Sequence, residues 1–569
     1  MTASRPAGRV WLGLALVCVF NAALLWFFHD RYWYPTDDGF YAHIADRLRS
    51  GEVLNHDIQD IHPGYIHFLH ALAFQVFGLD LVSLRYPMVA AAFVQAIVVF
   101  VLLLERGLLL AIVGGLATNA LGIVQFMSPN ANWYCMALAV VLAWWLMARP
   151  HGPTRLVGAG VILGTLTLFR HLTGIWVAMA VIVLALLERS SDARGRQLVL
   201  MRLQIAIMLA AAVGYLYWNP DTEPGGVIFM GVWPVAVLGW MFFTGRTRNR
   251  DVATAVGLLF AGTLIPTIPF VLYHFAHGSL GVLVHNLVVV ASGELDLGFY
   301  GRGWYGVLPL AGFYQATSSF DFVRIVNGLY WTILPAVSAV NGALVVRALR
   351  NHADARTLTL PMIAVFFAMV ALLFEGPLYL YYTVGLSLIG AMWLLAGAAP
   401  AMRGLSAAAA VALSAVAVIF HAGQTRERNP VQILAGDRVT KFADLVDCGL
   451  PRCSLKVSAS DHMTYGDLAK VIEAHTAPDD FILAIPNDAE LYFLTGRKNP
   501  TRFYNASQGT TTSELQHEVV QALDRHPPQL VFFRPDDKYN TRATLDIMTR
   551  VRSRYAFLGS QHGIEIYRR

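Results

Sequence analysis

The sequence predicts a multi-pass α-helical membrane protein with about 13 transmembrane helices and a C-terminal extracytoplasmic α/β domain. Of its 569 residues, 56% are hydrophobic and 14% are charged, whereas about 25% are charged in a typical soluble protein. Apolar runs of roughly 16 to 25 residues recur between Val10 and Phe420, and such runs approach or cross a hydrocarbon layer about 30 Å thick. Beyond them the composition turns polar. These observations exclude an ordinary soluble enzyme.

The apolar runs define the expected spans. The first run, from Val10 to Phe28, is longer than the roughly 7 to 15 apolar residues of a secretory signal, so we expect a retained helix. The segment 156–187 breaks at FRHLTG, which predicts two short helices with Arg170 and His171 at their junction. The expected spans are 10–28, 83–104, 107–126, 132–148, 156–169, 172–187, 203–218, 225–243, 252–275, 322–346, 358–374, 378–396 and 404–420.

Arginines mark one set of loops, which predicts that those loops are cytoplasmic. Basic loops flank the segment 156–187 on both sides, so this segment must enter the membrane and return. A charge at its tip is costly unless it faces water or an anion, so the tip is either a functional site or a snorkelling turn. Thirteen spans place the N-terminus in the cytoplasm and the region after residue 421 outside. The small net charge of +5, carried mainly in these loops, predicts no nucleic-acid partner.

The cysteines support this orientation. Cys448 and Cys453, in DCGLPRC, are spaced for a small surface disulfide, which persists only in an oxidising compartment. Cys18 and Cys135 lie in apolar runs, so we expect them to be packing residues.

The first large outer loop, 29–82, predicts two short amphipathic helices at the membrane interface. Phe40, Ile44 and Leu48 recur at helical spacing behind Thr36-Asp37-Asp38, and a second helix begins after Pro63. Acids at a helix start cap N–H groups and offset the dipole, which is the structural interpretation of Asp37 and Asp38. Neighbouring side chains on a helix diverge, so one acid could cap while the other serves as a base.

The same loop holds a dense group of histidines and aspartates: His56, Asp57, Asp60, His62, His67 and His70. Their spacing matches no closed zinc pattern. We therefore expect no required cofactor, with a divalent metal at this group as the less favoured alternative.

Two further outer loops carry polar and aromatic residues. The loop 276–321 contains Glu294, Asp296, Arg302, Trp304 and Tyr305, a mixture that suits a sugar face with a phosphate contact, or ordinary interfacial anchoring. The short loop FEGPLYLYYTVG adds Glu375, Tyr379, Tyr381 and Tyr382 at the same face.

The motif TDDGFYAHIADRLRSGE followed by IHPGYIHFL resembles the GT-C superfamily of membrane glycosyltransferases, especially the protein O-mannosyltransferases and lipid A aminoarabinose transferases of glycosyltransferase families 39 and 83. That group shows an acidic pair, a tyrosine and a short helix, then a His-Pro or Lys-Pro-Pro element. Here these are Asp37-Asp38, Tyr41 and His62-Pro63. The sequence departs from the pattern at Asp38, where many relatives have Glu, at Phe40, where aminoarabinose transferases have Arg, and at Gly64, which replaces the second proline.

The resemblance implies a donor sugar linked to polyprenyl phosphate, transferred with inversion to a glycan, lipid or protein hydroxyl on the outer face of a bacterial inner membrane. Phosphate leaves as a stable anion, so one carboxylate base and phosphate-binding cations are enough. We expect Asp37 to be the base. The full set of expected site residues is Asp37, Asp38 and His62 for catalysis; Arg170, His171, Arg302, Tyr41 and Tyr65 for the donor and its phosphate; and Glu294, Trp304, Tyr305, Tyr381 and Tyr382 for the sugar or acceptor.

The polar C-terminal region divides the chain into a transmembrane domain, 1–421, and a soluble domain, 422–569. Strand-like runs at 481–485, 529–533, 555–559 and 564–567 alternate with helical segments near 488–495, 513–525 and 541–552, which predicts a small α/β sandwich with a mostly parallel sheet. No glycine-rich phosphate loop occurs there. We therefore expect this domain to guide the acceptor or to act as a structural lid.

Two other function classes stay open from the sequence. One is a polyprenol-linked sugar transporter or flippase, which should carry ionisable or unwound positions near the membrane midplane. The spans contain only scattered groups such as Gln95, Asn119 and Gln204, which disfavours it. The other is a non-catalytic cell-envelope assembly protein.

Overall fold

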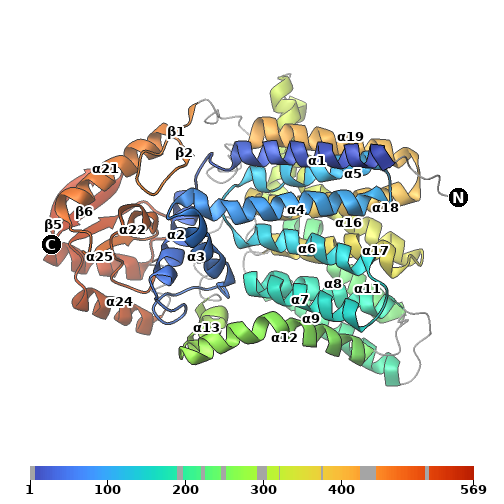
Figure 1. The fold of residues 1–569 in the computed structure, drawn as a ribbon, viewed down its shortest axis with the longest axis horizontal. Helices are drawn as coiled ribbons and strands as arrows, with labels where there is room; N and C mark the ends of the chain where they lie inside the picture. Colours follow the sequence, from blue (N-terminus) through green and yellow to red (C-terminus); the bar gives the residue numbers. More distant parts are fainter. Residues whose placement is uncertain are drawn as a thin grey trace.

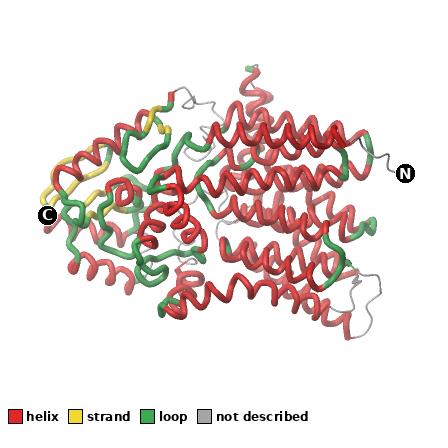
Figure 2. Tube along the Cα trace, viewed as in Figure 1, coloured by secondary structure: helices red, strands yellow, loops and turns green. Residues whose placement is uncertain are grey.

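The computed structural model describes residues 7–188, 196–218, 224–244, 252–290, 304–318, 321–372, 376–422, 444–505 and 512–569. These residues form a bundle of long helices with a smaller domain at one end (Figure 1). The β-strands are confined to that smaller domain (Figure 2). The first helix, α1, begins at Ala7 at the end of the bundle farthest from the domain and runs along the bundle toward it (Figure 1).

Eleven described helices are long and apolar enough to cross a membrane, and two shorter ones complete the 13 predicted spans. The eleven are Ala7–Phe28, Leu81–Leu104, Leu108–Gln125, Ala131–Ala148, Leu198–Trp218, Pro224–Thr244, Ala253–Ala276, Phe322–Arg350, Ala355–Leu372, Pro377–Ala398 and Ala401–His421. They correspond in chain order to α1, α4, α5, α6, α9, α11, α12, α16, α17, α18 and α19, with short 3₁₀ or π segments extending several of them. The prediction of a multi-pass helical membrane protein is confirmed.

The predicted hairpin is α7 (Pro153–Phe169) and α8 (His171–Leu187), two 17-residue helices joined by Arg170 alone. The break occurs because Arg170 adopts an extended backbone, with φ −155° and ψ 106°. Helix α7 also packs tightly on α12 (Val252–Ala276), since a Cβ on Gly160 would lie 2.8 Å from the Cα of Gly262. Gly160 and Gly262 therefore allow the hairpin to pack closely against α12.

The loop 29–82 contains both predicted short helices, α2 (Pro35–Arg49) and α3 (Tyr65–Phe77). They lie between the bundle and the C-terminal domain (Figure 1). Their setting differs from a simple interfacial platform, because Ile44 of α2 is fully buried and Gly39 abuts the C-terminal domain. The second loop contributes α13 (Leu280–His285) and α15 (Trp304–Ser318).

The C-terminal domain has a four-stranded sheet in the order β3-β4-β6-β5. The prediction of a mostly parallel sheet is wrong: β3 and β4 are parallel, whereas β4–β6 and β5–β6 are antiparallel. The last two strands form a hairpin through His562 and Gly563, a connection too short for the crossover that parallel strands need. The strands are β3 (Ile482–Ile485), β4 (Leu530–Phe533), β5 (Ala556–Gln561) and β6 (Ile564–Arg568).

Helices cover both faces of this sheet, because successive strand residues point to opposite sides. Leu483 and Ile485 pack with α24 (Ser513–Arg525) and α25 (Arg542–Arg554), while Ile482 and Ala484 share the core of the opposite face. That face holds α21 (Ala459–His475) and α22 (Glu490–Thr495). A separate two-stranded ribbon, β1 (Val446–Asp447) with β2 (Lys456–Val457), is bridged by the Cys448–Cys453 disulfide.

Glu490, at the start of α22, is fully buried, and its Oε1 accepts a hydrogen bond of 2.6 Å from the Tyr465 hydroxyl. Burial, and then the neighbouring Asp488 carboxylate, raises the pKa of Glu490 to about 8. In the unfolded chain the group has its ordinary pKa of 4.5. Between these values the folded protein holds a proton that the unfolded chain has released, so the free energy of unfolding decreases as pH rises.

We therefore expect Glu490→Gln to remove this contribution. As the pH rises from about 5 to about 8, the unfolding midpoint of wild type should therefore fall relative to that of the variant. Thermal unfolding of the detergent-purified protein measures it. If the unfolding midpoints of the two proteins change in parallel across that pH range, the raised pKa of Glu490 is contradicted.

Candidate active site

Asp38 is fixed by a buried ion pair. Its Oδ2 accepts a hydrogen bond of 2.7 Å from Nη2 of Arg85, the first residue of α4, and another of 3.1 Å from the backbone N–H of Tyr34. Both side chains are almost completely buried. The second contact satisfies a backbone donor at the start of α2, as helix capping requires. Asp38 is thus a structural acid that joins α2 to the bundle.

Asp37 lies on a different side of α2 and is partly exposed. At about 100° per residue, it shares one helix side with Tyr41, four positions later. Burial raises the pKa of the Tyr41 hydroxyl well above its ordinary value, and the charge of Asp37 raises it further, whereas Arg170 lowers it. Both charges therefore act on the same hydroxyl, which also makes a backbone hydrogen bond with Ala131, the first residue of α6.

Arg170 is the cation of this site. Only 6% of the residue is exposed, although it carries a full charge at the junction of two apolar helices. Within the described ranges, no carboxylate forms an ion pair with its guanidinium. Its neighbours include neutral aromatic side chains: the guanidinium carbon lies 6.0 Å from the ring centroid of Tyr379, and Tyr41 and Tyr382 are in electrostatic reach. A buried charge is costly without a counter-charge. An anion bound beside Arg170 would offset this cost.

Several buried polar atoms on the elements that adjoin Arg170 lack a hydrogen-bond partner among the described residues. They occur on the residues after the α7–α8 junction, at the start of α6 and at the start of α18 (Pro377–Ala398). Buried polar groups are nearly always hydrogen-bonded in folded proteins. The atoms are His171 Nδ1, Thr173 Oγ1, Trp176 Nε1, Asn132 Oδ1, Tyr134 Oη and Tyr382 Oη. Such a group suits a polar ligand.

His62 is held by Asp60. Its Nδ1 lies 3.0 Å from Asp60 Oδ1, and the other carboxylate oxygen lies 2.8 Å from Nε2 of His67. Burial alone would raise the pKa of Asp60, but hydrogen bonds and charge from His62, then from His67, keep it below its ordinary value. Asp60 is thus an anion that holds two imidazoles. His62 is also within electrostatic reach of His171, so this cluster adjoins the hairpin tip.

Gly64 allows this arrangement. Its φ is +83°, and a Cβ there would lie 2.5 Å from Leu54 Cδ2 and 3.2 Å from Asp60 Oδ2. Glycine adopts a positive φ without steric cost. The residue that replaces the second proline of the related motif is therefore needed to bring α3 against Asp60.

The other histidines and aspartates do not gather further. His56 pairs with Asp57 at 2.7 Å on the surface, and His70 is buried against Tyr41 with its ring centroid 5.3 Å away. Among the residues that the structure describes, no three His, Cys, Asp or Glu side chains converge as a metal-binding group.

The remaining expected residues fall into three groups. Tyr65 packs edge-to-face on Phe169, beside the hairpin tip, and Tyr382 lies among Asp37, Tyr41 and Arg170. Tyr305 and Tyr381 are fully buried, with their hydroxyls respectively 2.9 Å from the carbonyl of Ala371 and 2.8 Å from the hydroxyl of Tyr330. Glu294, Arg302 and the side chain of Trp304 lie outside the described residues.

Comparisons with known proteins were made against sequences and structures. No protein-family model and no curated protein matches the sequence. Three similar solved structures are ArnT from Cupriavidus metallidurans bound to undecaprenyl phosphate (14% identity, 99% of this chain and 98% of that one, TM-score 0.39), the same protein in the apo state (14%, 99% and 98%, 0.41), and the apo Archaeoglobus fulgidus oligosaccharyltransferase (13%, 92% and 69%, 0.46).

These structures are membrane glycosyltransferases of the GT-C kind that the motif resembles. With TM-scores below 0.5 and identities of 13% to 14%, the likeness does not extend to substrate or mechanism.

Sequence reasoning missed two structural residues of the site. Arg85 stands three positions into an apolar span, and such a charge signals a buried partner, although nothing in the sequence names Asp38 as that partner. Asp60 was only one of six members of the His/Asp group. Its central place depends on the left-handed turn at Gly64, which only the three-dimensional arrangement shows.

We expect Arg85→Ala to destabilise the protein by about 3 to 5 kcal/mol, because it leaves Asp38 buried without its counter-charge. The matched control is Arg356→Ala, which breaks an exposed pair with Glu105 and should cost about 0 to 1 kcal/mol. Thermal unfolding in detergent compares them. Equal, small losses in the two variants would show that the Asp38–Arg85 pair contributes little.

Proposed function

We propose that this chain is an inverting glycosyltransferase that moves a sugar from a polyprenyl-phosphate donor to an acceptor hydroxyl at the extracytoplasmic surface of a bacterial inner membrane. The observation that carries the proposal is Arg170: a buried cation at the junction of two membrane-inserted helices, without an ion-pair partner in the described structure, beside a carboxylate and several tyrosines. A lipid phosphate is an anion that reaches such a depth without leaving the bilayer.

The adjacent acids have separate tasks in this proposal. Asp38 holds α2 through Arg85, and Asp37, on the side of α2 that carries Tyr41, is the base. Its carboxylate takes the proton from the acceptor hydroxyl as the hydroxyl oxygen forms a bond to the anomeric carbon. The bond from that carbon to the phosphate oxygen breaks, and the electron pair leaves with polyprenyl phosphate. Attack opposite the leaving group inverts the anomeric centre.

The leaving group needs charge stabilisation more than a proton, because phosphate departs as an anion. Arg170 supplies a guanidinium whose planar N–H groups match phosphate oxygens. His62, oriented by Asp60, supplies a second donor at the same end of the bundle. We propose that these two side chains, with the tyrosine hydroxyls, make a divalent metal unnecessary. The acceptor class, whether glycan, lipid or protein, is left open by the proposal.

The decisive experiment compares wild type with Asp37→Asn. Both are purified in detergent, and co-purifying lipid is identified by mass spectrometry. We expect a polyprenyl-phosphate sugar on the variant and little on wild type, because only wild type turns the donor over. Normal transfer by Asp37→Asn would disprove the base. Movement of sugar-lipid across sealed vesicles without any acceptor would instead indicate a transporter.

We expect Arg170→Ala to weaken binding of polyprenyl phosphate by about 10- to 150-fold, the equivalent of a lost charge-assisted contact of ~1.5 to 3 kcal/mol. Titration of the detergent-purified protein measures it. The control is Arg149→Ala, whose guanidinium lies 4.6 Å over the Trp145 ring at the other end of the bundle. Equal affinities for the Arg170 variant and wild type would reject the phosphate assignment.

A further inference from the structure

Helix α2 has two contact sides. Gly39, His43, Asp46 and Arg47 recur at three- and four-residue spacing, and all four contact the C-terminal domain. We call these residues the α2 docking face. Asp37 and Tyr41 lie on the opposite side of the helix, at about 100° per residue. The helix that carries the proposed base is therefore held from behind by another domain.

The closest approach is at Gly39, two residues after Asp37. A Cβ on Gly39 would lie 2.6 Å from the Cα and 2.7 Å from the backbone nitrogen of Glu490. Since these are backbone atoms at the start of α22, no side-chain rotation could relieve the overlap. The distance between α2 and α22 is thus fixed by the absence of a side chain at position 39.

Aromatic contacts continue this interface along α2. Tyr504 stacks on Phe40 with ring centroids 4.8 Å apart and an interplanar angle of 16°. Tyr492 of α22 stacks on His43 at 4.8 Å, and Asn499 Nδ2 lies 3.4 Å from Nε2 of the same histidine. These contacts are buried, so the two domains share one core here rather than a wet surface.

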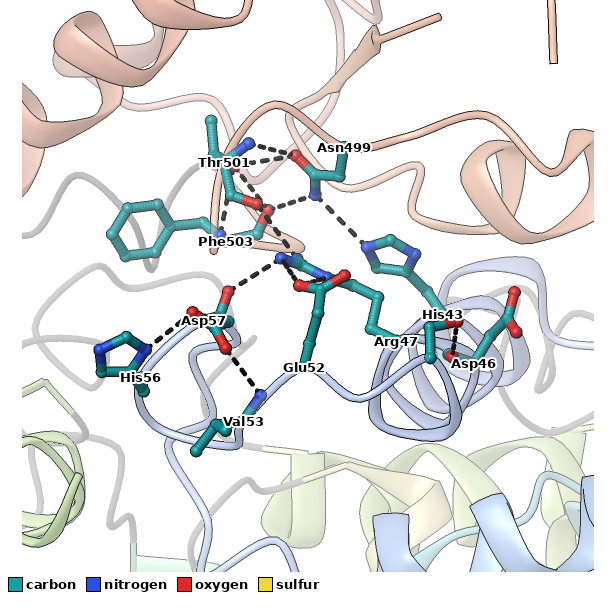
Figure 3. A network of polar contacts seen from close by, with 11 residues as sticks. His43, Asp46, Arg47, Glu52, Val53, His56, Asp57, Asn499, Thr501 and Phe503 are labelled. Carbon is teal, nitrogen blue, oxygen red and sulfur yellow. Dashed lines mark hydrogen bonds and ion pairs between the residues drawn. The ribbon is translucent and has the colours of Figure 1, made fainter. Parts of the chain in front are cut away.

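Arg47 joins three segments. Its Nη1 donates to the carbonyl of Thr501 at 3.1 Å, its Nη2 donates to the carbonyl of Asp57 at 2.8 Å, and its Nε donates to Glu52 at 2.8 Å. Figure 3 shows Arg47 reaching from α2 between the 52–57 loop and the 499–503 segment. Arg47 therefore links the end of α2 to the loop before His62 and to the C-terminal domain.

Trp33, which precedes α2, also contacts the C-terminal domain. Trp33 Nε1 donates to Asp461 Oδ2 at 3.0 Å, and its ring meets that of Tyr465 edge-on at 4.7 Å. Tyr465 in turn holds Glu490. Contacts on both sides of Asp37 along the chain thus lead to α21 and α22.

From this arrangement we infer that the C-terminal domain positions Asp37, through the close contact of Gly39 with Glu490, and that it stays docked behind α2 during turnover as a fixed support instead of opening as a lid. Gly39 and Glu490 are positioning residues, because Gly39 lies on the side of α2 away from Asp37 and Glu490 lies on α22, which packs against that side. The inference rests on the proposed function, in which Asp37 is the base.

The first test is Gly39→Ala. The added methyl must push α2 away from α22. A displacement of about 1 Å at a reacting group costs about 10- to 100-fold in rate. We expect kcat to fall by that factor while the Kd for polyprenyl phosphate, bound by Arg170 on another element, stays within about twofold of wild type. The control is Gly466→Ala in α21, whose new methyl meets no atom within 4 Å and should leave kcat unchanged.

A Gly39→Ala protein with normal kcat would overturn the inference and leave the proposed function intact. Normal transfer by Asp37→Asn would instead remove the proposed function. The two failures are therefore distinguishable.

The second test does not depend on Gly39→Ala folding. Asp46 and Arg452 form a partly exposed pair across the interface, with 3.2 Å between Nη1 and the carboxylate. In the double variant Asp46→Cys/Arg452→Cys, a short bis-maleimide links the C-terminal domain to α2. A linked protein that keeps at least half of the unlinked rate supports the inference that the domain stays docked behind α2. Loss of turnover on linking, absent from either single variant treated alike, would show that the domain must open and would overturn the inference.

Discussion

The site depends on one buried ion pair. Arg85 donates to Asp38 and also to the backbone carbonyls of His29, Arg31 and Tyr32, at 2.7 to 3.2 Å. One guanidinium therefore joins the end of α1, the start of α2 and the start of α4. A buried charge pair of this kind adds little net stability compared with apolar packing, but its geometry is strict. It determines where α2 begins, and hence where Asp37 lies relative to the bundle.

The adjacent acids show how a helix start separates two chemically identical groups. Successive side chains on a helix diverge by about 100°, so Asp38 points into the bundle toward Arg85 while Asp37 shares a side with Tyr41. The glycine that follows leaves a third side flat enough for another domain to pack against. Under the proposed function, three consecutive residues thus serve catalysis, anchoring and docking.

Much of this architecture was predictable because membrane helices obey a simple length and polarity rule. All 13 spans, the break at Arg170 and both short helices of the first loop follow from hydropathy and periodicity. The candidate site was predictable only in part: Asp37, Tyr41, His62 and Arg170 come from a local motif and from a charge in an apolar segment. The Arg85–Asp38 pair joins residues 47 positions apart, and the contact of Gly39 with Glu490 joins residues about 450 positions apart, so no local pattern encodes them. The Asp60 cluster is local in sequence, but it depends on the left-handed backbone at Gly64.

The sheet shows the same limit at smaller scale. The four strands were visible as apolar runs, but their pairing directions depend on which connections leave room for a crossover. The two-residue link at His562 and Gly563 forces a hairpin, which turns the sheet from mostly parallel to mixed.

The single-residue junction between α7 and α8 has a consequence for the surrounding lipid. Two 17-residue helices reach about 25 Å, which is shorter than a hydrocarbon layer of about 30 Å. Hydrophobic mismatch of this kind is relieved by thinning the bilayer locally. In a bilayer thinned in this way, headgroups and water would lie closer to Arg170. Under the proposed function, the short hairpin would thus bring this buried charge and the phosphate of a polyprenyl donor to the same depth.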